Sequence, residues 1–194
     1  MSKAVFLDRD GVINPLVYNI LTHAYESPKH PGDFSVFTYA AKALRLLKIN
    51  GYKTILISNQ PDYAKGKAKM EDLLEIAKML SEFSVENYGL IDDYYYCYHH
   101  PQGIVAEYTK DCLCRKPGTL FVEEAIKKHT LERSQCFFIG DRKSDMECGT
   151  KAGVRTIRIV ANHSQDSDIE RNQICAMNLF KAAQWIVRKE GNTG

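Results

Sequence analysis

Two pairs of aspartates in this sequence could hold a divalent cation. Asp8 and Asp10 follow a short apolar run and lie two residues apart, so in extended backbone their side chains point to the same side. Asp141 and Asp145, which follow a second apolar run, supply further oxygens. A carboxylate cluster with few ligands of other types is typical of Mg²⁺, although an isolated Asp-x-Asp is more often a solvated turn.

Groups that could bind a phosphate follow other apolar runs. Ser58 and Asn59 offer a hydroxyl and an amide donor, and Lys116 offers a positive point charge. Lys116 alone would be an ordinary surface lysine. Together with the aspartates, these residues predict a site that binds a phosphoryl group beside a metal ion.

The loop over 97–116 carries the ligands of a zinc site. Cys97-x-His99 and Cys112-x-Cys114 place three thiolates and one imidazole within 18 residues, which is the ligand set of a closed, tetrahedral structural Zn²⁺ site. Four protein ligands leave no open position for catalysis, and no basic recognition helix follows, which argues against a nucleic-acid-binding finger. The alternative is a set of unconnected cysteines. We expect zinc to pin the loop and to orient the two basic residues directly after Cys114.

Strands and helices alternate along the chain, which predicts an α/β fold with a parallel sheet and helices on both faces. The apolar pattern places strands over 3–7, 53–57, 93–97, 136–139 and 154–160, and helices over 39–49, 70–86, 119–128, 144–151 and 179–187. Segment 14–36 is predicted to be a long loop at the substrate entrance, and 161–172 a polar loop. Ligands bind beyond the carboxyl ends of such strands, where the polar clusters fall.

The bulk composition limits the classes of function. The chain has 194 residues with a net charge of +2, which suits one domain over 1–194 and gives no reason to expect nucleic acid or membrane partners. No apolar run approaches the roughly 20 residues needed to span a bilayer. We expect a cytoplasmic monomer whose partner is a small phosphorylated substrate.

Four motifs resemble those of the haloacid dehalogenase superfamily in order and spacing. They are Asp8-Arg9-Asp10-Gly11-Val12-Ile13, Ser58-Asn59-Gln60, Lys116-Pro117 and Gly140-Asp141-Arg142-Lys143-Ser144-Asp145. The resemblance covers residues 3–160, and the tail fits as the last strand and helix of that fold. It implies a Rossmann-like sheet with a zinc-pinned loop and no separate cap domain.

The resemblance also implies a role for each aspartate. Asp8 would attack phosphorus and form an aspartyl-phosphate, and Asp10 would act as general acid and then as general base. Mg²⁺ would be held by the Asp8 side chain, the Asp10 backbone carbonyl and Asp141, with Asp145 as a direct or water-mediated ligand. Lys116 would stabilise the transferring phosphoryl group.

The zinc loop is similar to that of one branch of the superfamily, which holds the D,D-heptose 1,7-bisphosphate 7-phosphatases and the histidinol-phosphate phosphatases. The sequence His-His-Pro-Gln-Gly over 99–103 is closer to the heptose enzymes. By this resemblance Ser58, Asn59 and Gln60 would bind substrate, and Arg115 would contact its second phosphate or its sugar.

Three hypotheses for the function stay open on the sequence. Pro61-Asp62 replaces the Ser-Gly that is usual in the heptose enzymes, and Asp62 pointing inward would disfavour a sugar bisphosphate. A cationic histidinol phosphate would instead favour Asp62 or Glu26 near the entrance. A non-catalytic phosphoryl-binding protein is the third hypothesis, and it is disfavoured because Asp8 and the other motif residues are present.

Overall fold

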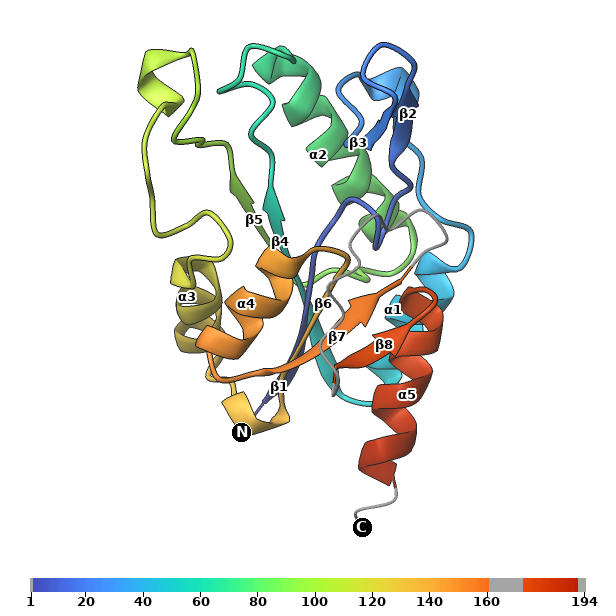
Figure 1. Cartoon of the computed structure of the whole chain (residues 1–194). Coiled ribbons are helices and arrows are strands. Elements are labelled where there is room, and N and C mark those ends of the chain that lie inside the picture. The colour runs from blue at the N-terminus through green and yellow to red at the C-terminus, as the bar shows by residue number, and fades with distance from the viewer. Residues whose placement is uncertain (1, 161–172, 192–194) are drawn as a thin grey trace.

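A computed structural model, which describes residues 2–160 and 173–191, contains one six-stranded parallel sheet (Figure 1). Its strand order is β5-β4-β1-β6-β7-β8. The strands are β1 (Lys3–Leu7), β4 (Tyr52–Asn59), β5 (Asp93–Cys97), β6 (Phe137–Gly140), β7 (Arg155–Ile159) and β8 (Ile174–Ala176). From β1 the chain first adds β4 and β5 on one side of the sheet and then β6, β7 and β8 on the other side, so the direction of winding reverses between β1 and β6. The predicted α/β fold is confirmed, and ligands bind at such a change of direction.

Helices cover both faces of the sheet (Figure 1). On one face lie α1 (Ala40–Ile49), α2 (Met70–Glu86) and α5 (Leu179–Gly191); on the other lie α3 (Leu120–His129) and α4 (Lys143–Lys151). The alternating side chains of β1 explain this arrangement. Val5 and Leu7 join the first apolar core, while Ala4 and Phe6 join the second, and all four are fully buried. β1 is thus anchored on both faces, which fixes the position of the residue that follows it.

The predicted loop over 14–36 is wrong in part, because it contains an antiparallel hairpin. The hairpin consists of β2 (Val17–Asn19) and β3 (Ala24–Glu26) and is followed by a 3-10 turn over Pro31–Asp33. Tyr18 and Tyr25 pack across it with their ring centroids 5.2 Å apart. Three-residue strands are too short to show a period-two pattern, and no Asn-Gly turn marks their connection, so the hairpin has little signature in the sequence.

The other boundaries differ from the sequence predictions by a few residues. β4 extends through Ser58 and Asn59, so these two residues end the strand instead of following it. β8 supplies the sixth strand, which only the family resemblance had suggested. Segment 161–172 lies outside the described residues.

Residues 8–39, between β1 and α1, hold only the hairpin and the 3-10 turn, so no cap domain is inserted there. Within residues 2–160 and 173–191, no helix combines the length and apolar character that a membrane crossing requires.

Candidate active site and metal sites

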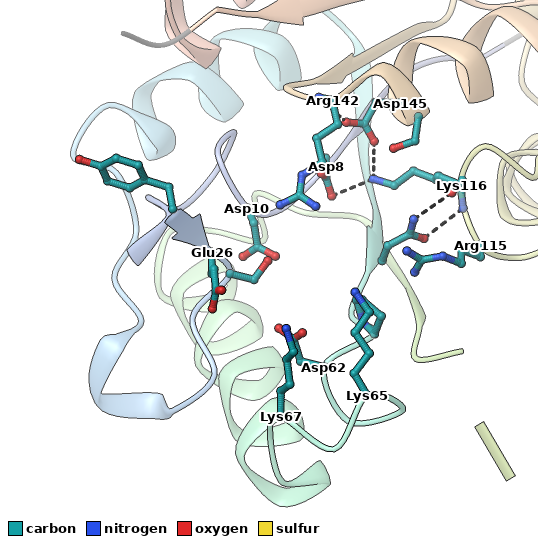
Figure 2. Close-up of a pocket in the computed structure, with 15 residues that line it drawn as sticks. Asp8, Asp10, Glu26, Asp62, Lys65, Lys67, Arg115, Lys116, Arg142 and Asp145 are labelled. Carbon is teal, nitrogen blue, oxygen red and sulfur yellow. Dashed lines mark hydrogen bonds and ion pairs between the residues drawn. The ribbon is translucent and has the colours of Figure 1, made fainter. Parts of the chain in front are cut away.

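A pocket of about 290 Å³ opens at the carboxyl ends of β1 and β4 (Figure 2). Its walls come from the end of β1, the β2–β3 hairpin, the segment after β4, the end of the zinc loop and the start of α4. Six residues predicted from the sequence line it, namely Asp8, Asp10, Asn59, Arg115, Lys116 and Asp145. Ser58 and Gln60 are buried, with 1% and 2% of their surface exposed, and do not line the pocket.

Asp8 continues the β1 ladder and turns its carboxylate into the pocket. Its N–H donates to Ile139 O on β6 at 3.0 Å, which fixes the backbone. Asp8 Oδ1 accepts a hydrogen bond from Arg9 N at 2.8 Å and lies 2.8 Å from Lys116 Nζ. Burial raises the pKa of Asp8 to about 6, although Lys116 opposes the rise. Asp8 is therefore a poorly hydrated carboxylate that is ionised at neutral pH and can act as a nucleophile.

Lys116 is a buried cation held by two carboxylates. Its Nζ lies 2.8 Å from Asp8 Oδ1 and 2.7 Å from Asp145 Oδ1, and it donates to Ile57 O at 2.8 Å. Burial alone would lower the pKa of Lys116, but the charges of Asp145 and Asp8 outweigh burial and raise it. Lys116 thus carries a fixed positive charge beside the nucleophile.

Asn59 positions Lys116 through its backbone. Asn59 Nδ2 donates to Lys116 O at 3.1 Å, and Lys116 N–H donates to Asn59 Oδ1 at 3.0 Å. The amide that was predicted to bind phosphate is thus engaged with the main chain. This pair of hydrogen bonds explains how an asparagine at the end of β4 orients a lysine 57 residues further along the chain.

Asp10 receives four hydrogen bonds from the protein. Its Oδ1 accepts from Arg9 Nε at 3.0 Å and Asn14 Nδ2 at 2.9 Å, and its Oδ2 accepts from Gln60 Nε2 at 2.7 Å and Arg9 Nη2 at 3.3 Å. Burial opposes ionisation of Asp10, but Arg9 and the amide donors hold its pKa below the usual range. In this geometry Asp10 is a carboxylate and can accept a proton, whereas donating one requires some of these bonds to open. Gln60 Oε1 also accepts a hydrogen bond from Arg9 Nη2 at 2.9 Å, so Gln60 helps to fix the position of both Arg9 and Asp10.

The residues Asp8, Asp141 and Asp145 form a cluster that suits Mg²⁺. One carboxylate oxygen from each lies within 4.8 Å of the others. Asp141 Oδ1 is buried and has no hydrogen-bond partner among the described residues, and burial, with the charges of Asp8 and Asp145, raises the pKa of Asp141 to about 8. Asp145 Oδ2 is oriented by Arg142 N–H at 2.9 Å. An unpartnered oxygen among repelling carboxylates fits a divalent cation with oxygen ligands.

The four predicted zinc ligands meet at one point. Cys114 Sγ lies 3.3 Å from Cys97 Sγ, 3.2 Å from Cys112 Sγ and 3.4 Å from His99 Nδ1. Cys97 Sγ lies 3.6 Å from Cys112 Sγ and 3.8 Å from His99 Nδ1. Zinc–sulfur bonds of about 2.3 Å in a tetrahedron imply sulfur–sulfur edges of about 3.8 Å, so the cluster is slightly contracted but of the right shape. The donor set therefore fits a closed zinc site.

Basic residues at the outer part of the pocket were missed by the sequence analysis. Lys65, Lys67 and Arg142 line it together with the predicted Arg115 (Figure 2). Burial lowers the pKa of Lys65; Asp62 opposes this, but Arg115 and the other cations add to it. The positive charges are thus close enough to repel one another, and they suit an anionic ligand. The Lys65-Gly66-Lys67 sequence, shortly after Asp62, was a visible signal, but it belongs to none of the four motifs and to no strand or helix.

Glu26 of β3 also reaches the pocket, but its charge is already engaged. It forms an ion pair with Lys29 and accepts hydrogen bonds from Asn19 Nδ2 at 3.0 Å and Thr22 Oγ1 at 2.8 Å. The hydrogen bond from Lys29 contributes most to lowering the pKa of Glu26 to about 2. Glu26 therefore stabilises the hairpin first and adds little free negative charge to the entrance.

Comparisons with known proteins agree with this site. A family model described as HAD-hydrolase-like matches residues 113–181. A D-glycero-alpha-D-manno-heptose-1,7-bisphosphate 7-phosphatase of Photorhabdus laumondii is 36% identical over 188 residues, which cover 95% of this chain and 96% of the relative. A D-glycero-D-manno-heptose-1,7-bisphosphate 7-phosphatase of Chlorobaculum tepidum is 33% identical, with 89% of this chain and 86% of the relative covered.

The fold has counterparts among solved structures. The D,D-heptose 1,7-bisphosphate phosphatase of B. bronchiseptica, complexed with magnesium and phosphate, superposes with a TM-score of 0.76 at 19% identity and covers 97% of this chain and 99% of that one. Fold and site together define a hydrolase of the haloacid dehalogenase type. The chain belongs to the haloacid dehalogenase-like hydrolases and, within them, to the family of the heptose bisphosphate 7-phosphatases.

Proposed function

We propose that this protein is a Mg²⁺-dependent phosphomonoester hydrolase whose nucleophile is Asp8. The observation that carries the proposal is the environment of the buried Asp8 carboxylate, which lines the pocket. Asp8 Oδ1 lies 2.8 Å from Lys116 Nζ, and the same carboxylate forms a cluster with Asp141 and Asp145. A nucleophile, a fixed cation and a metal cradle in one place are the requirements of phosphoryl transfer to a carboxylate.

The chemistry would proceed in two steps at Asp8. In the first step an Asp8 oxygen attacks phosphorus, the bond from phosphorus to the leaving oxygen breaks, and that oxygen takes a proton from Asp10. For this step Asp10 must first have taken up a proton from solvent, with some of its hydrogen bonds opened. In the second step Asp10 takes a proton from water, the water oxygen attacks the phosphorus of the aspartyl-phosphate, and Asp8 leaves as a carboxylate. Lys116 neutralises charge on the phosphoryl oxygens in both steps.

Mg²⁺ would be held by the side chains of Asp8, Asp141 and Asp145 and by the backbone carbonyl of Asp10. When bound, it would supply further neutralisation of the phosphoryl group and so reduce its repulsion from the Asp8 carboxylate. The unpartnered Asp141 Oδ1 and the mutual proximity of the three carboxylates support this assignment.

The substrate that we propose is D-glycero-D-manno-heptose 1,7-bisphosphate, from which the enzyme removes the 7-phosphate. The names of the relatives support this choice. The pocket also supports it, because Lys65, Lys67 and Arg115 can bind a second phosphate, whereas Asp62 opposes such binding and Glu26 is paired with Lys29. Ser58 would take part through its hydroxyl only indirectly, since Gln60 Nε2 donates to Ser58 Oγ at 2.9 Å.

Histidinol phosphate fits this pocket less well. Its cationic amine would face Lys65, Lys67 and Arg115, and Glu26, one of the two carboxylates considered for it, is paired with Lys29. The test compares kcat/KM for the heptose bisphosphate, histidinol phosphate and p-nitrophenyl phosphate. We expect the bisphosphate to exceed the aryl phosphate by at least about a hundredfold, since a second phosphate that binds several basic groups contributes about 3 kcal/mol. Equal values for all three compounds would contradict the proposed substrate.

Three further assignments belong to the same proposal. The zinc would be structural and hold the 97–116 loop, because its four protein ligands leave no open position. The chain would act as a single domain over 1–194 and as a monomer. Its place of action would be the cytoplasm, where a phosphorylated sugar is available as substrate.

A further inference from the structure

Lys65 and Lys67 lie on a short segment that folds as consecutive turns after β4. We call residues 61–68 the lysine turn. Lys65 N–H donates to Pro61 O at 3.0 Å, and Lys67 N–H donates to Asp62 O at 2.7 Å. Gly66 has φ +66° and closes the turn. The segment is too short to form a core of its own, so its conformation depends on the structure packed against it.

The zinc loop provides that support through its backbone. Ala64 O, on a fully buried residue of the lysine turn, accepts hydrogen bonds from Ile104 N at 2.7 Å and Val105 N at 3.1 Å. Gln60 N–H, directly before the turn, donates to the carbonyl of the zinc ligand Cys97 at 2.7 Å. The zinc loop is thus hydrogen-bonded to the middle of the lysine turn and to the residue directly before it.

A pair of tyrosines joins the two segments on their outer side. Tyr63 of the lysine turn and Tyr108 of the zinc loop pack edge to face with ring centroids 5.0 Å apart. The two backbones come close at Gly103, where a Cβ would lie 2.8 Å from Ala64 O. Only glycine permits this approach without a shift of one of the two segments, whereas at Gly66 a Cβ would meet only the exposed side chain of Ile104.

We propose that Tyr63 determines specificity from outside the pocket, because its contact with Tyr108, together with the hydrogen bonds to Ala64, holds Lys65 ready to bind the non-reacting phosphate of a bisphosphate substrate. This inference rests on the proposed function. Tyr63 is a positioning residue: it does not line the pocket, but it orients a turn that does. A lysine on an ordered turn loses less conformational entropy on binding than one on a free loop, so the contact raises affinity without touching substrate.

The test is the kinetics of Tyr63→Ala on two substrates. For the heptose bisphosphate we expect KM to rise about tenfold with kcat unchanged, since a preorganised anion contact is lost. For p-nitrophenyl phosphate, which has no second phosphate, we expect both parameters to stay as in the wild type. Tyr63→Phe keeps the ring contact and should restore the wild-type KM. Tyr88→Ala, at a tyrosine that is 89% exposed, is the matched control.

A double variant tests whether Tyr63 acts through Lys65. Lys65→Met should raise the bisphosphate KM, and adding Tyr63→Ala should then have little further effect, because the two changes remove one interaction. Zinc content and Tm are measured for every variant. If Tyr63→Ala loses zinc or stability, Tyr63→Leu, which keeps apolar volume, replaces it in both comparisons.

The possible results separate this inference from the proposed function. A wild-type enzyme without preference for the bisphosphate over the aryl phosphate would overturn both. A wild-type preference that Tyr63→Ala retains would overturn the inference alone. Equal losses on the two substrates, or additive effects of Tyr63→Ala and Lys65→Met, would show that Tyr63 is a general structural residue and would also overturn it.

Discussion

Replacing Lys116 with methionine tests the electrostatics of the site. The Lys116 side chain is 1% exposed, and its Nζ lies 2.8 Å from Asp8 Oδ1 and 2.7 Å from Asp145 Oδ1. Methionine keeps most of the apolar stem and removes the charge. Removing one partner of a buried ion pair costs about 3–5 kcal/mol, because a charge is left unpaired. We predict a loss of this size in the free energy of unfolding of the metal-free protein.

The loss should depend on pH. Lys116 opposes the effect of burial, which raises the pKa of Asp8 from 3.8 to about 6. Without Lys116 the pKa of Asp8 in the folded protein rises further, while its unfolded value does not change. A group with a raised folded pKa stabilises the fold below its unfolded pKa, and this contribution is lost as the pH rises through the folded pKa. The deficit of Lys116→Met should therefore grow between about pH 5 and about pH 8.

Urea unfolding in the presence of a chelator at these two pH values measures the effect. The matched control is Lys78→Met, since Lys78 is 60% exposed and pairs with Glu75 at 3.2 Å. This pair is screened by solvent, so its removal should change stability little at either pH. The reasoning fails if Lys116→Met loses no more stability than the control, or if its deficit is the same at both pH values.

Three further predictions concern other parts of the chain. Cys112→Ser should abolish zinc binding and lower Tm by several degrees, whereas Cys175→Ser, at an exposed cysteine outside the cluster, should change neither. Elemental analysis and thermal unfolding measure both effects, and a variant that lacks zinc but keeps the wild-type Tm would contradict the structural role. Gly11→Ala should raise the Mg²⁺ concentration needed for half-maximal activity at least about tenfold, because φ at Gly11 is +79° and a Cβ there would lie 2.8 Å from Asp141 Cγ. A magnesium titration that matches the wild type would refute the close approach. Asp93→Asn should cost about 1 kcal/mol of stability at neutral pH, because hydrogen bonds from Lys128 and His129 outweigh burial and hold the pKa of Asp93 near 2. This stability is present above the unfolded pKa of 3.8 and is lost as the pH falls from about 4 to about 2. Acid unfolding should therefore show the stabilities of wild type and variant converging over that range.

The parts of the fold that the sequence predicted well have a long repeating pattern. The helix predicted over 70–86 matches α2, and β1 and β5 match their predicted ranges, because amphipathic spacing or a continuous apolar run marks each of them. The β2–β3 hairpin was missed because it is held by Tyr18, Tyr25 and Glu26 and not by a repeating pattern. Short elements that depend on such specific contacts leave no periodic signal.

The sequence predicted which residues meet at the candidate site better than it predicted their contacts. The motif residues Asp8, Asp145 and Lys116 converge as expected, because Asp8 follows β1, Asp145 lies in the first turn of α4 after β6, and Lys116 ends the zinc loop after β5. Asn59 and Gln60 also lie at this edge of the sheet, but their amides hydrogen-bond to Lys116 and Asp10. Sequence spacing identifies which residues meet, whereas hydrogen-bond partners depend on side-chain rotamers that spacing does not determine.

The basic side of the pocket illustrates a second limit. Lys65 and Lys67 belong to no strand or helix, and they lie on the lysine turn, which packs against the zinc loop. That packing joins segments about forty residues apart and includes a close approach of Gly103 to the backbone at Ala64. A pattern read along the chain carries no information on such a contact.

The central claim is that Asp8 becomes covalently phosphorylated during turnover. The direct measurement is rapid acid quenching of the enzyme with Mg²⁺ and the heptose bisphosphate, followed by digestion and peptide mass spectrometry. The account predicts a phosphoryl group on the peptide that contains Asp8, its release by hydroxylamine as expected for an acyl phosphate, and neither phosphorylation nor turnover in Asp8→Asn. Turnover by the wild type with no phosphoryl group on Asp8 at any quench time, or turnover by Asp8→Asn at the wild-type rate, would contradict it.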